Sequence, residues 1–211
     1  MTVRKEDLLI NGPRRSAIST LILAHGAGAP MDSDFMNQIA EGLGKEGIKV
    51  VRFEFPHMAE RRSTGKKRPP NSARILETTW REVIDLFETQ KPFVGGKSMG
   101  GRIASQVADP EKVAGCVCLG YPFHPPGKPD KLRTEHLKTT GVPTLILQGE
   151  RDPFGNAEEV VAYQLSKKVL LRNVPDGDHS FQPRKSSPAT LESNLGLVIA
   201  SVADFIRRNS R

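Results

Sequence analysis

Aromatic residues, long apolar runs and an apolar leader are scarce or missing in this sequence, and each scarcity removes a class of protein. At 6% of the chain, the aromatic residues are too few for a surface that stacks single-stranded nucleic acid. No apolar run approaches the roughly 20 residues of a membrane span. The opening segment, MTVRKEDLLINGP, lacks the apolar region of a signal peptide. We therefore expect a cytoplasmic protein with no membrane span.

Cysteine is also scarce. Cys116 and Cys118 lie in the apolar run VAGCVCLG, with no histidine nearby at metal-ligand spacing. We expect both to be reduced thiols of the core, which again suits the cytoplasm. Acidic residues are outnumbered by basic ones, which leaves a net charge of +7. That charge is compatible with an anionic partner, but without a nucleic-acid motif it does not make nucleic acid the expected one.

What the sequence does contain is an alternation of short apolar runs and amphipathic segments. Its 211 residues fit one domain, residues 1–211, large enough for a hydrophobic core. We expect strands in ISTLILAHG, IKVVRFEFP, PFVGG, VAGCVCLG, VPTLILQG and KKVLLRNVP, and helices over 34–46, 72–89, 156–166, 191–207 and after Ser98. This order predicts an α/β fold with a doubly wound, mostly parallel sheet flanked by helices. Functional residues are then expected at the carboxyl ends of the strands.

The stretch FVGGKSMGGR contains two overlapping motifs. Its Gly-Lys-Ser could end a phosphate-binding loop, but such a loop needs a glycine where this chain has Lys91, and Pro92 has no N–H for a phosphate. Its Gly-x-Ser-x-Gly joins an expected strand to an expected helix, the turn that presents a nucleophilic serine. Side chains at the two flanking glycines would collide across so tight a turn. We favour Ser98 as a nucleophile over an incidental serine in a glycine-rich turn.

Two more residues follow in the chain order of a catalytic triad. Asp152 comes after the strand of LILQGERDPFG, and His179 lies in VPDGDHSF after the last strand. Ser98, Asp152 and His179 each follow a different strand at its carboxyl end, so they can converge as nucleophile, orienting acid and base. Glu150 is a rival to Asp152, which could instead cap the next helix.

The other four histidines suit the role of the base less well than His179. His25 and His57 precede the serine, where we expect hydrogen-bonded loop residues, and His124 and His136 fall between serine and acid.

An oxyanion hole needs two N–H donors. Met99 follows the nucleophile and supplies one, and the small residues of LILAHGAGAP supply the other, with Ala27 favoured and Gly28 as a second candidate. These roles require no metal and no cofactor.

Four elements in order, HGAGAP, GKSMGG, GERDPFG and GDHSF, resemble the α/β-hydrolase superfamily over nearly the whole chain. GGKSMGG followed by YPFHPPGKP is similar to a small, lidless branch, which includes dienelactone-hydrolase-like proteins and the hydrolase-like domain of a non-specific-lethal complex subunit. Dienelactone hydrolase itself uses a cysteine nucleophile where this chain has Ser98, so the resemblance does not imply that substrate.

These observations favour a carboxylesterase-like serine hydrolase that cleaves small ester or thioester substrates through an acyl-enzyme intermediate. Only 23 residues, Gly120 to Val142, separate two expected strands, which is too few for a large lid. The alternative class is a non-catalytic interaction module on the same fold. Three separated polar residues in triad order argue against it. The sequence does not define the oligomeric state.

Two cationic features remain. Lys97 precedes the nucleophile, and we favour a solvated side chain pointing away from the site over one that stabilises a negative intermediate. RRSTGKKRPP, residues 61–70, holds Arg61, Arg62, Lys66, Lys67 and Arg68 with no acid among them. We expect an irregular loop at the carboxyl edge of the sheet. A solvated flap is the favoured interpretation, and attraction of anionic substrates is the alternative.

Overall fold

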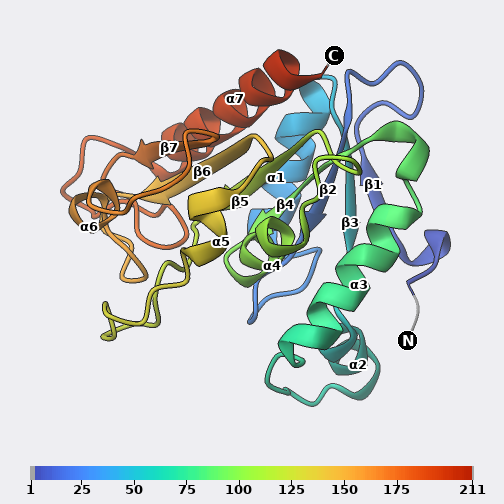
Figure 1. Cartoon of the computed structure of the whole chain (residues 1–211), viewed down its shortest axis with the longest axis horizontal. Helices are drawn as coiled ribbons and strands as arrows, with labels where there is room; N and C mark the ends of the chain where they lie inside the picture. The colour runs from blue at the N-terminus through green and yellow to red at the C-terminus, as the bar shows by residue number, and fades with distance from the viewer. Residues whose placement is uncertain (1–2, 211) are drawn as a thin grey trace.

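The computed structural model describes residues 3–210, apart from the side chain of residue 88, as a sheet with helices on both faces (Figure 1). Seven strands lie in the order β1-β3-β2-β4-β5-β6-β7. Every neighbouring pair is parallel except β1 and β3, which are antiparallel. The predicted α/β fold with a doubly wound, mostly parallel sheet is confirmed.

All six predicted strands are present: β2 (Thr20–Ala24), β3 (Lys49–Phe53), β4 (Phe93–Lys97), β5 (Gly115–Leu119), β6 (Thr144–Gly149) and β7 (Val169–Val174). A seventh strand, β1 (Leu9–Asn11), lies outside the predicted strands and has only three residues. β7 differs from the prediction of burial on both faces. It is an edge strand of the sheet, and its Leu170 is 56% exposed.

The helices form two layers. α1 (Asp34–Lys45) and α7 (Leu191–Asn209) cover one face, and α3 (Ala73–Asp85), α4 (Met99–Val107) and the short α5 (Glu135–Thr139) cover the other (Figure 1). Neighbouring residues of a strand supply both cores, since successive side chains point to opposite faces. In β2, Ile22 packs on the α3 side and Leu23 on the α1 side. Cys116 and Cys118 are buried free thiols on the α3 side.

α5 lies outside the predicted helices, and α6 (Ala157–Val161) and α2 (Pro56–Thr64) also differ from expectation. α6 is shorter than the predicted 156–166. α2 was not predicted and includes the first part of the basic segment. It begins with a proline, whose missing N–H costs nothing in the first turn, and ends at Gly65 with φ of +70°. Among residues 3–210, no helix is both long and apolar enough to span a membrane.

Candidate active site

Ser98 sits in a strained turn between β4 and α4. Its φ of 51° and ψ of −116° lie outside the regions that a non-glycine residue normally adopts. The flanking glycines make the turn possible. A Cβ at Gly96 would lie 2.5 Å from the Ala24 carbonyl oxygen, and one at Gly100 would lie 2.5 Å from the His25 carbonyl oxygen. The turn therefore lifts the Ser98 hydroxyl out of the sheet at its carboxyl edge.

The side chains of Ser98, His179 and Asp152 are linked by hydrogen bonds. The Ser98 Oγ is 2.8 Å from His179 Nε2, and His179 Nδ1 is 2.8 Å from Asp152 Oδ2. Asp152 is fully buried, whereas the His179 side chain is 22% exposed. Glu150, the rival acid, is exposed and accepts a bond from the Asp176 N–H instead. The three residues singled out in the sequence thus lie together, and the rival carboxylate lies apart from them.

Gln148 holds Asp152 in place, a role that sequence reasoning missed. Its Nε2 lies 2.9 Å from Asp152 Oδ2, and its Oε1 accepts a bond from the Tyr121 N–H at 2.7 Å. The second carboxylate oxygen of Asp152 accepts the Phe154 N–H at 2.9 Å. All the polar atoms of this buried carboxylate are thereby satisfied, which fixes its orientation toward His179. The only sequence signal is a polar residue at the end of the apolar run LILQG.

The turn that carries His179 is also fixed. The Asp178 carboxylate accepts bonds from the N–H groups of Ser180 at 2.7 Å and Gln182 at 3.0 Å. Asn194 of α7 donates to the Phe181 carbonyl at 2.9 Å. The Phe154 ring lies 4.4 Å from the His179 ring, centroid to centroid. Contacts from two distant parts of the chain therefore hold the imidazole.

The two expected oxyanion donors lie beside the serine. Met99 is the first residue of α4, and Ala27 is in the loop after β2. Within residues 3–210, neither N–H donates a hydrogen bond to another protein group. Both N–H groups are therefore free for a ligand, and the start of α4 adds a favourable dipole for an anion.

His25 fastens the loop of Ala27 to the rest of the protein. Its Nδ1 contacts the Gly26 carbonyl oxygen at 2.6 Å, and its Nε2 accepts the Phe55 N–H at 3.1 Å. Burial lowers the pKa of His25 to about 4, so the ring is neutral at physiological pH. This agrees with a hydrogen-bonded loop residue.

The remaining histidines take part in other contacts. His57 is buried beside Asn71, His124 contacts Glu159 at 2.7 Å, and His136 contacts Ser105 at 2.9 Å.

The prediction that Lys97 is solvated and points away from the site is wrong. Lys97 is only 9% exposed, and its ammonium donates to the backbone carbonyl of His179. As the last residue of β4, it projects toward the α1 face, which is covered by protein. Burial lowers the pKa of Lys97 to about 8, and the charges of Asp152 and Asp178 act in the opposite direction.

The prediction of an irregular loop over 61–70 is wrong for its first part. Residues 61 to 64 belong to α2, and residues 65 to 70 contain no helix or strand. Arg62 is neutralised by Glu54 at 2.6 Å and Asp32 at 2.8 Å, and Arg68 pairs with Glu60 at 2.8 Å.

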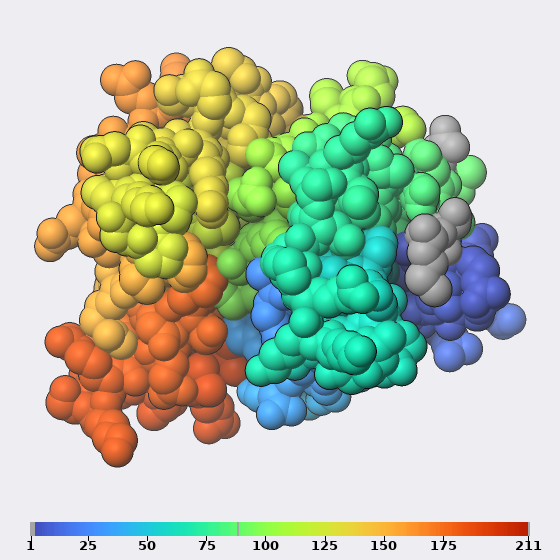
Figure 2. All heavy atoms as spheres, turned by 90° about the horizontal axis from the view of Figure 1, so that it is seen from below, coloured from blue at the N-terminus to red at the C-terminus, as the bar shows by residue number. Residues whose placement is uncertain are grey.

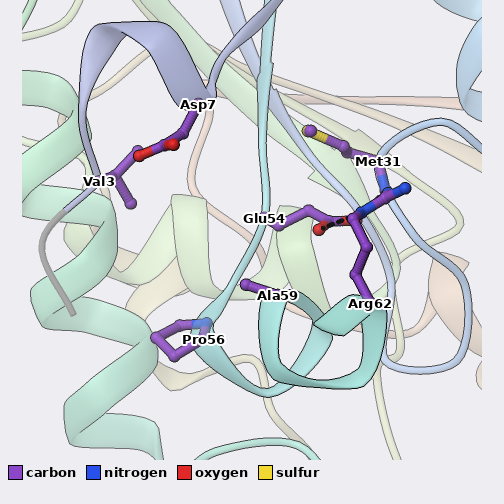
Figure 3. Close-up of a pocket in the computed structure, with 7 residues that line it drawn as sticks. All are labelled: Val3, Asp7, Met31, Glu54, Pro56, Ala59 and Arg62. Atoms are coloured by element: carbon purple, nitrogen blue, oxygen red, sulfur yellow. Dashed lines mark hydrogen bonds and ion pairs between the residues drawn. The ribbon is translucent and has the colours of Figure 1, made fainter. Parts of the chain in front are cut away.

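Figure 3 shows Arg62 directed at Glu54 beside a cavity of about 280 Å³ that contains none of Ser98, Asp152 and His179. Arg61 instead donates to the Gly28 carbonyl at 3.1 Å, next to Ala27.

A second cavity, of about 330 Å³, opens over the serine. Its lining includes Ser98, His179, Lys97, the loop 26–29 and the apolar side chains of Phe35, Met36 and Phe154. In Figure 2 the molecule is hollowed between the α2 region and the segments coloured yellow to orange. No residue of 120–142 is among the lining residues of this cavity.

Residues 17–207 match the family model described as alpha/beta hydrolase domain. The chain belongs to this family. The match spans the elbow of Ser98, the turn of Asp152 and the loop of His179, so the predicted resemblance to the α/β-hydrolase superfamily is confirmed.

Solved structures share the α/β-hydrolase fold of this chain at low sequence identity. Dienelactone hydrolase from Anabaena variabilis is 22% identical with a TM-score of 0.73, covering 97% of this chain and 92% of that one. Est1E from Butyrivibrio proteoclasticus is 15% identical with a TM-score of 0.71, covering 96% and 93%. XC6422 from Xanthomonas campestris, described as a serine hydrolase without lid, is 16% identical with a TM-score of 0.66, covering 95% and 88%. Family membership supports a hydrolase, and these likenesses support its fold.

Proposed function

We propose that this α/β-hydrolase is a carboxylesterase-like serine hydrolase that cleaves small esters or thioesters through an acyl-enzyme intermediate. The hydrogen-bonded series Ser98–His179–Asp152 at the bottom of an open cavity carries the proposal. A serine hydroxyl is a weak nucleophile unless a base accepts its proton, and His179 Nε2 lies where it can do so. A scaffold without catalysis has no need of this alignment.

In the proposed reaction, Ser98 Oγ attacks the substrate carbonyl carbon while His179 Nε2 takes the hydroxyl proton. The resulting oxyanion accepts bonds from the N–H groups of Ala27 and Met99. His179 then gives its proton to the leaving alcohol or thiol, and the acyl group stays on Ser98. Water attacks that ester with His179 again as base, which releases the acid and restores the serine. Throughout, Asp152 keeps the imidazole oriented and stabilises its cation.

Covalent labelling tests the proposal directly. A fluorophosphonate should phosphonylate Ser98 Oγ and release fluoride, because the probe places a phosphonyl oxygen where the oxyanion would lie. Peptide mass spectrometry should find the label on the peptide that contains Ser98. An intact, folded protein that stays unlabelled would favour the non-catalytic interaction module.

The cavity predicts a preference for short acyl chains. Its volume of about 330 Å³ and its walls of Phe35, Met36 and Phe154 suit a small apolar acyl group. Because residues 120–142 do not line it, no lid needs to open when substrate aggregates. We expect smooth saturation with p-nitrophenyl acetate and butyrate, and poor turnover of long-chain esters. A sharp rise in rate at the aggregation point of the substrate would contradict this.

Anionic esters should respond to salt more than neutral ones. Arg62 and Arg68 are paired, but Lys66 and Lys67 are exposed and Arg61 lies against the loop of Ala27. Long-range attraction weakens as the Debye length falls to about 8 Å near physiological ionic strength. We therefore expect kcat/KM for an anionic ester to fall with added salt while that for a neutral ester barely moves.

The matched variant for this prediction changes Arg61, Lys66 and Lys67 together to serine. It should remove the difference between the two esters. Equal salt responses in the unaltered protein would leave this basic segment as a solvated surface.

A further inference from the structure

Lys97 is a buried cation that none of the steps above uses. It is the last residue of β4, directly before Ser98, and its stem passes beneath Gly26, where an added Cβ would lie 3.6 Å from the Lys97 Cγ. Its ammonium ends at the backbone carbonyl oxygen of His179, 82 residues away in the sequence. Two adjacent residues of the elbow therefore contact His179. Ser98 Oγ contacts its imidazole, and the Lys97 ammonium contacts its backbone carbonyl.

The surroundings of the ammonium are built to hold it. The Lys97 Nζ lies 5.6 Å from the Phe35 ring centroid and 5.9 Å from that of Phe181, at cation–π distance. The absence of a side chain at Gly120 provides space for the ammonium. A Cβ there would lie 2.8 Å from the Lys97 Nζ and 2.7 Å from the His179 carbonyl oxygen. Within residues 3–210, no carboxylate forms an ion pair with Lys97.

A charge in this position is costly. Burial opposes the protonated form and lowers the pKa of Lys97 to about 8, although Asp152 and Asp178 favour the charge. A methionine would fill the same space without that penalty. A cost of this kind commonly occurs at functional sites, where groups with perturbed pKa values cluster.

We propose that Lys97 is the positioning residue of His179, and that its protonated side chain holds the His179 backbone so that the imidazole stays aligned between Asp152 and Ser98. This inference rests on the proposed serine hydrolase function. The carboxylate of Asp152 constrains the ring at Nδ1, and Lys97 constrains the peptide from which the ring projects. Two anchors, one on the ring and one on the backbone, leave the ring little freedom to swing away from Ser98 Oγ.

The charge matters because a bond donated by an ammonium is about twice as strong as one between neutral groups. The titratable groups that face Lys97 are Asp152, after β6, and Asp178 and His179, after β7. α1 contributes Phe35 to its surroundings, and the β2–α1 loop and the end of β5 contribute glycines. Loss of the Lys97 proton should therefore loosen the anchor on the His179 carbonyl.

The experiment compares the intact protein with Lys97→Met, Lys97→Gln and the control Lys167→Met, which alters an exposed lysine. With a neutral short-chain ester, Lys97→Met should lower kcat roughly 10- to 100-fold, the effect of a small misplacement of a reacting group. KM should stay within about twofold, because the apolar side chains of Phe35, Met36 and Phe154 that line the cavity are unchanged. Lys97→Gln, which keeps a donor without the charge, should also be impaired, and Lys167→Met should not.

The pH profile separates positioning from a merely structural role. The intact protein should lose kcat above about pH 8 as Lys97 gives up its proton, and Lys97→Met should show no such decline. Thermal unfolding supplies a second readout, because the pKa of Lys97 in the folded state lies below the ordinary lysine value of 10.5. The unfolded state then binds more protons between those two values, so the intact protein should gain stability relative to Lys97→Met as the pH rises from 8 to 10.5.

The outcomes are distinguishable. Suppose that the intact protein is labelled at Ser98, and that Lys97→Met or Lys97→Gln keeps full kcat and the same decline of kcat above about pH 8. The role of Lys97 is then overturned, and the proposed function stands. If the intact protein is neither labelled nor active, both are overturned. If Lys97→Met fails to fold, Lys97→Gln and the alkaline decline of the intact protein still decide the inference.

Discussion

Replacing Ser98 by alanine should lower kcat by about 10⁴-fold or more and abolish fluorophosphonate labelling. Among residues 3–210, the Ser98 Oγ has one hydrogen-bond partner, His179 Nε2 at 2.8 Å, so its removal takes away the nucleophile and little else. The backbone contacts of the turn remain, including the bond from the Ser98 N–H to the Leu119 carbonyl at 2.9 Å. The strain of the positive φ is the same for alanine. The variant should therefore fold as the parent does.

Residual activity in Ser98→Ala is expected, because the N–H groups of Ala27 and Met99 can still stabilise an oxyanion formed by water. Steady-state hydrolysis of p-nitrophenyl acetate measures the loss, and circular dichroism checks the fold. Ser63→Ala is a suitable control, since Ser63 is an exposed residue of α2 and its hydroxyl donates to the Glu60 carbonyl. Unchanged turnover in Ser98→Ala would sink the proposed function.

Replacing Asp152 by asparagine should reduce kcat by roughly 10⁴-fold without removing the nucleophile. The carboxylate accepts three bonds, from His179, Gln148 and the Phe154 N–H. Asparagine offers only one oxygen for these three donors. Its NH2 group, itself a donor, must face at least one of them. If the amide faces His179, the ring must place its proton on Nε2, where it can no longer accept the proton of Ser98.

The same mismatch should cost stability. A buried donor left without an acceptor costs about 1–3 kcal/mol, so the free energy of unfolding of Asp152→Asn should fall by that amount. Urea unfolding measures it. Glu150→Gln is the matched control, because Glu150 is exposed and bonds the Asp176 N–H rather than His179. If Glu150→Gln is the damaging change and Asp152→Asn is mild, the acid has been assigned to the wrong residue.

The sequence by itself determined where six of the seven strands lie along the chain, and it determined the strand-to-helix turn at Ser98. Both are local properties. Short apolar runs such as TLILA and TLILQG, bounded by turn residues, favour buried strands, and glycines on either side of a serine permit a turn that side chains would obstruct. Because parallel strands end at one edge, residues that follow different strands are brought together, and Asp152 and His179 could be singled out for that reason.

Only the tertiary structure decided where individual side chains point. Asp152 and Glu150 are two residues apart and alike in chemistry, and the choice between them depends on which one faces Gln148 and His179. In the sequence, Arg62 belongs to a basic run with no acid in it. In the structure, Asp32, 30 residues away, neutralises it. The sequence predicts a solvated Lys97, whereas in the structure its ammonium is surrounded by Phe35, Phe181 and the His179 carbonyl. Apart from the bond between Gln148 and Asp152, each of these contacts joins segments far apart in the chain, so no local pattern of residue types records it.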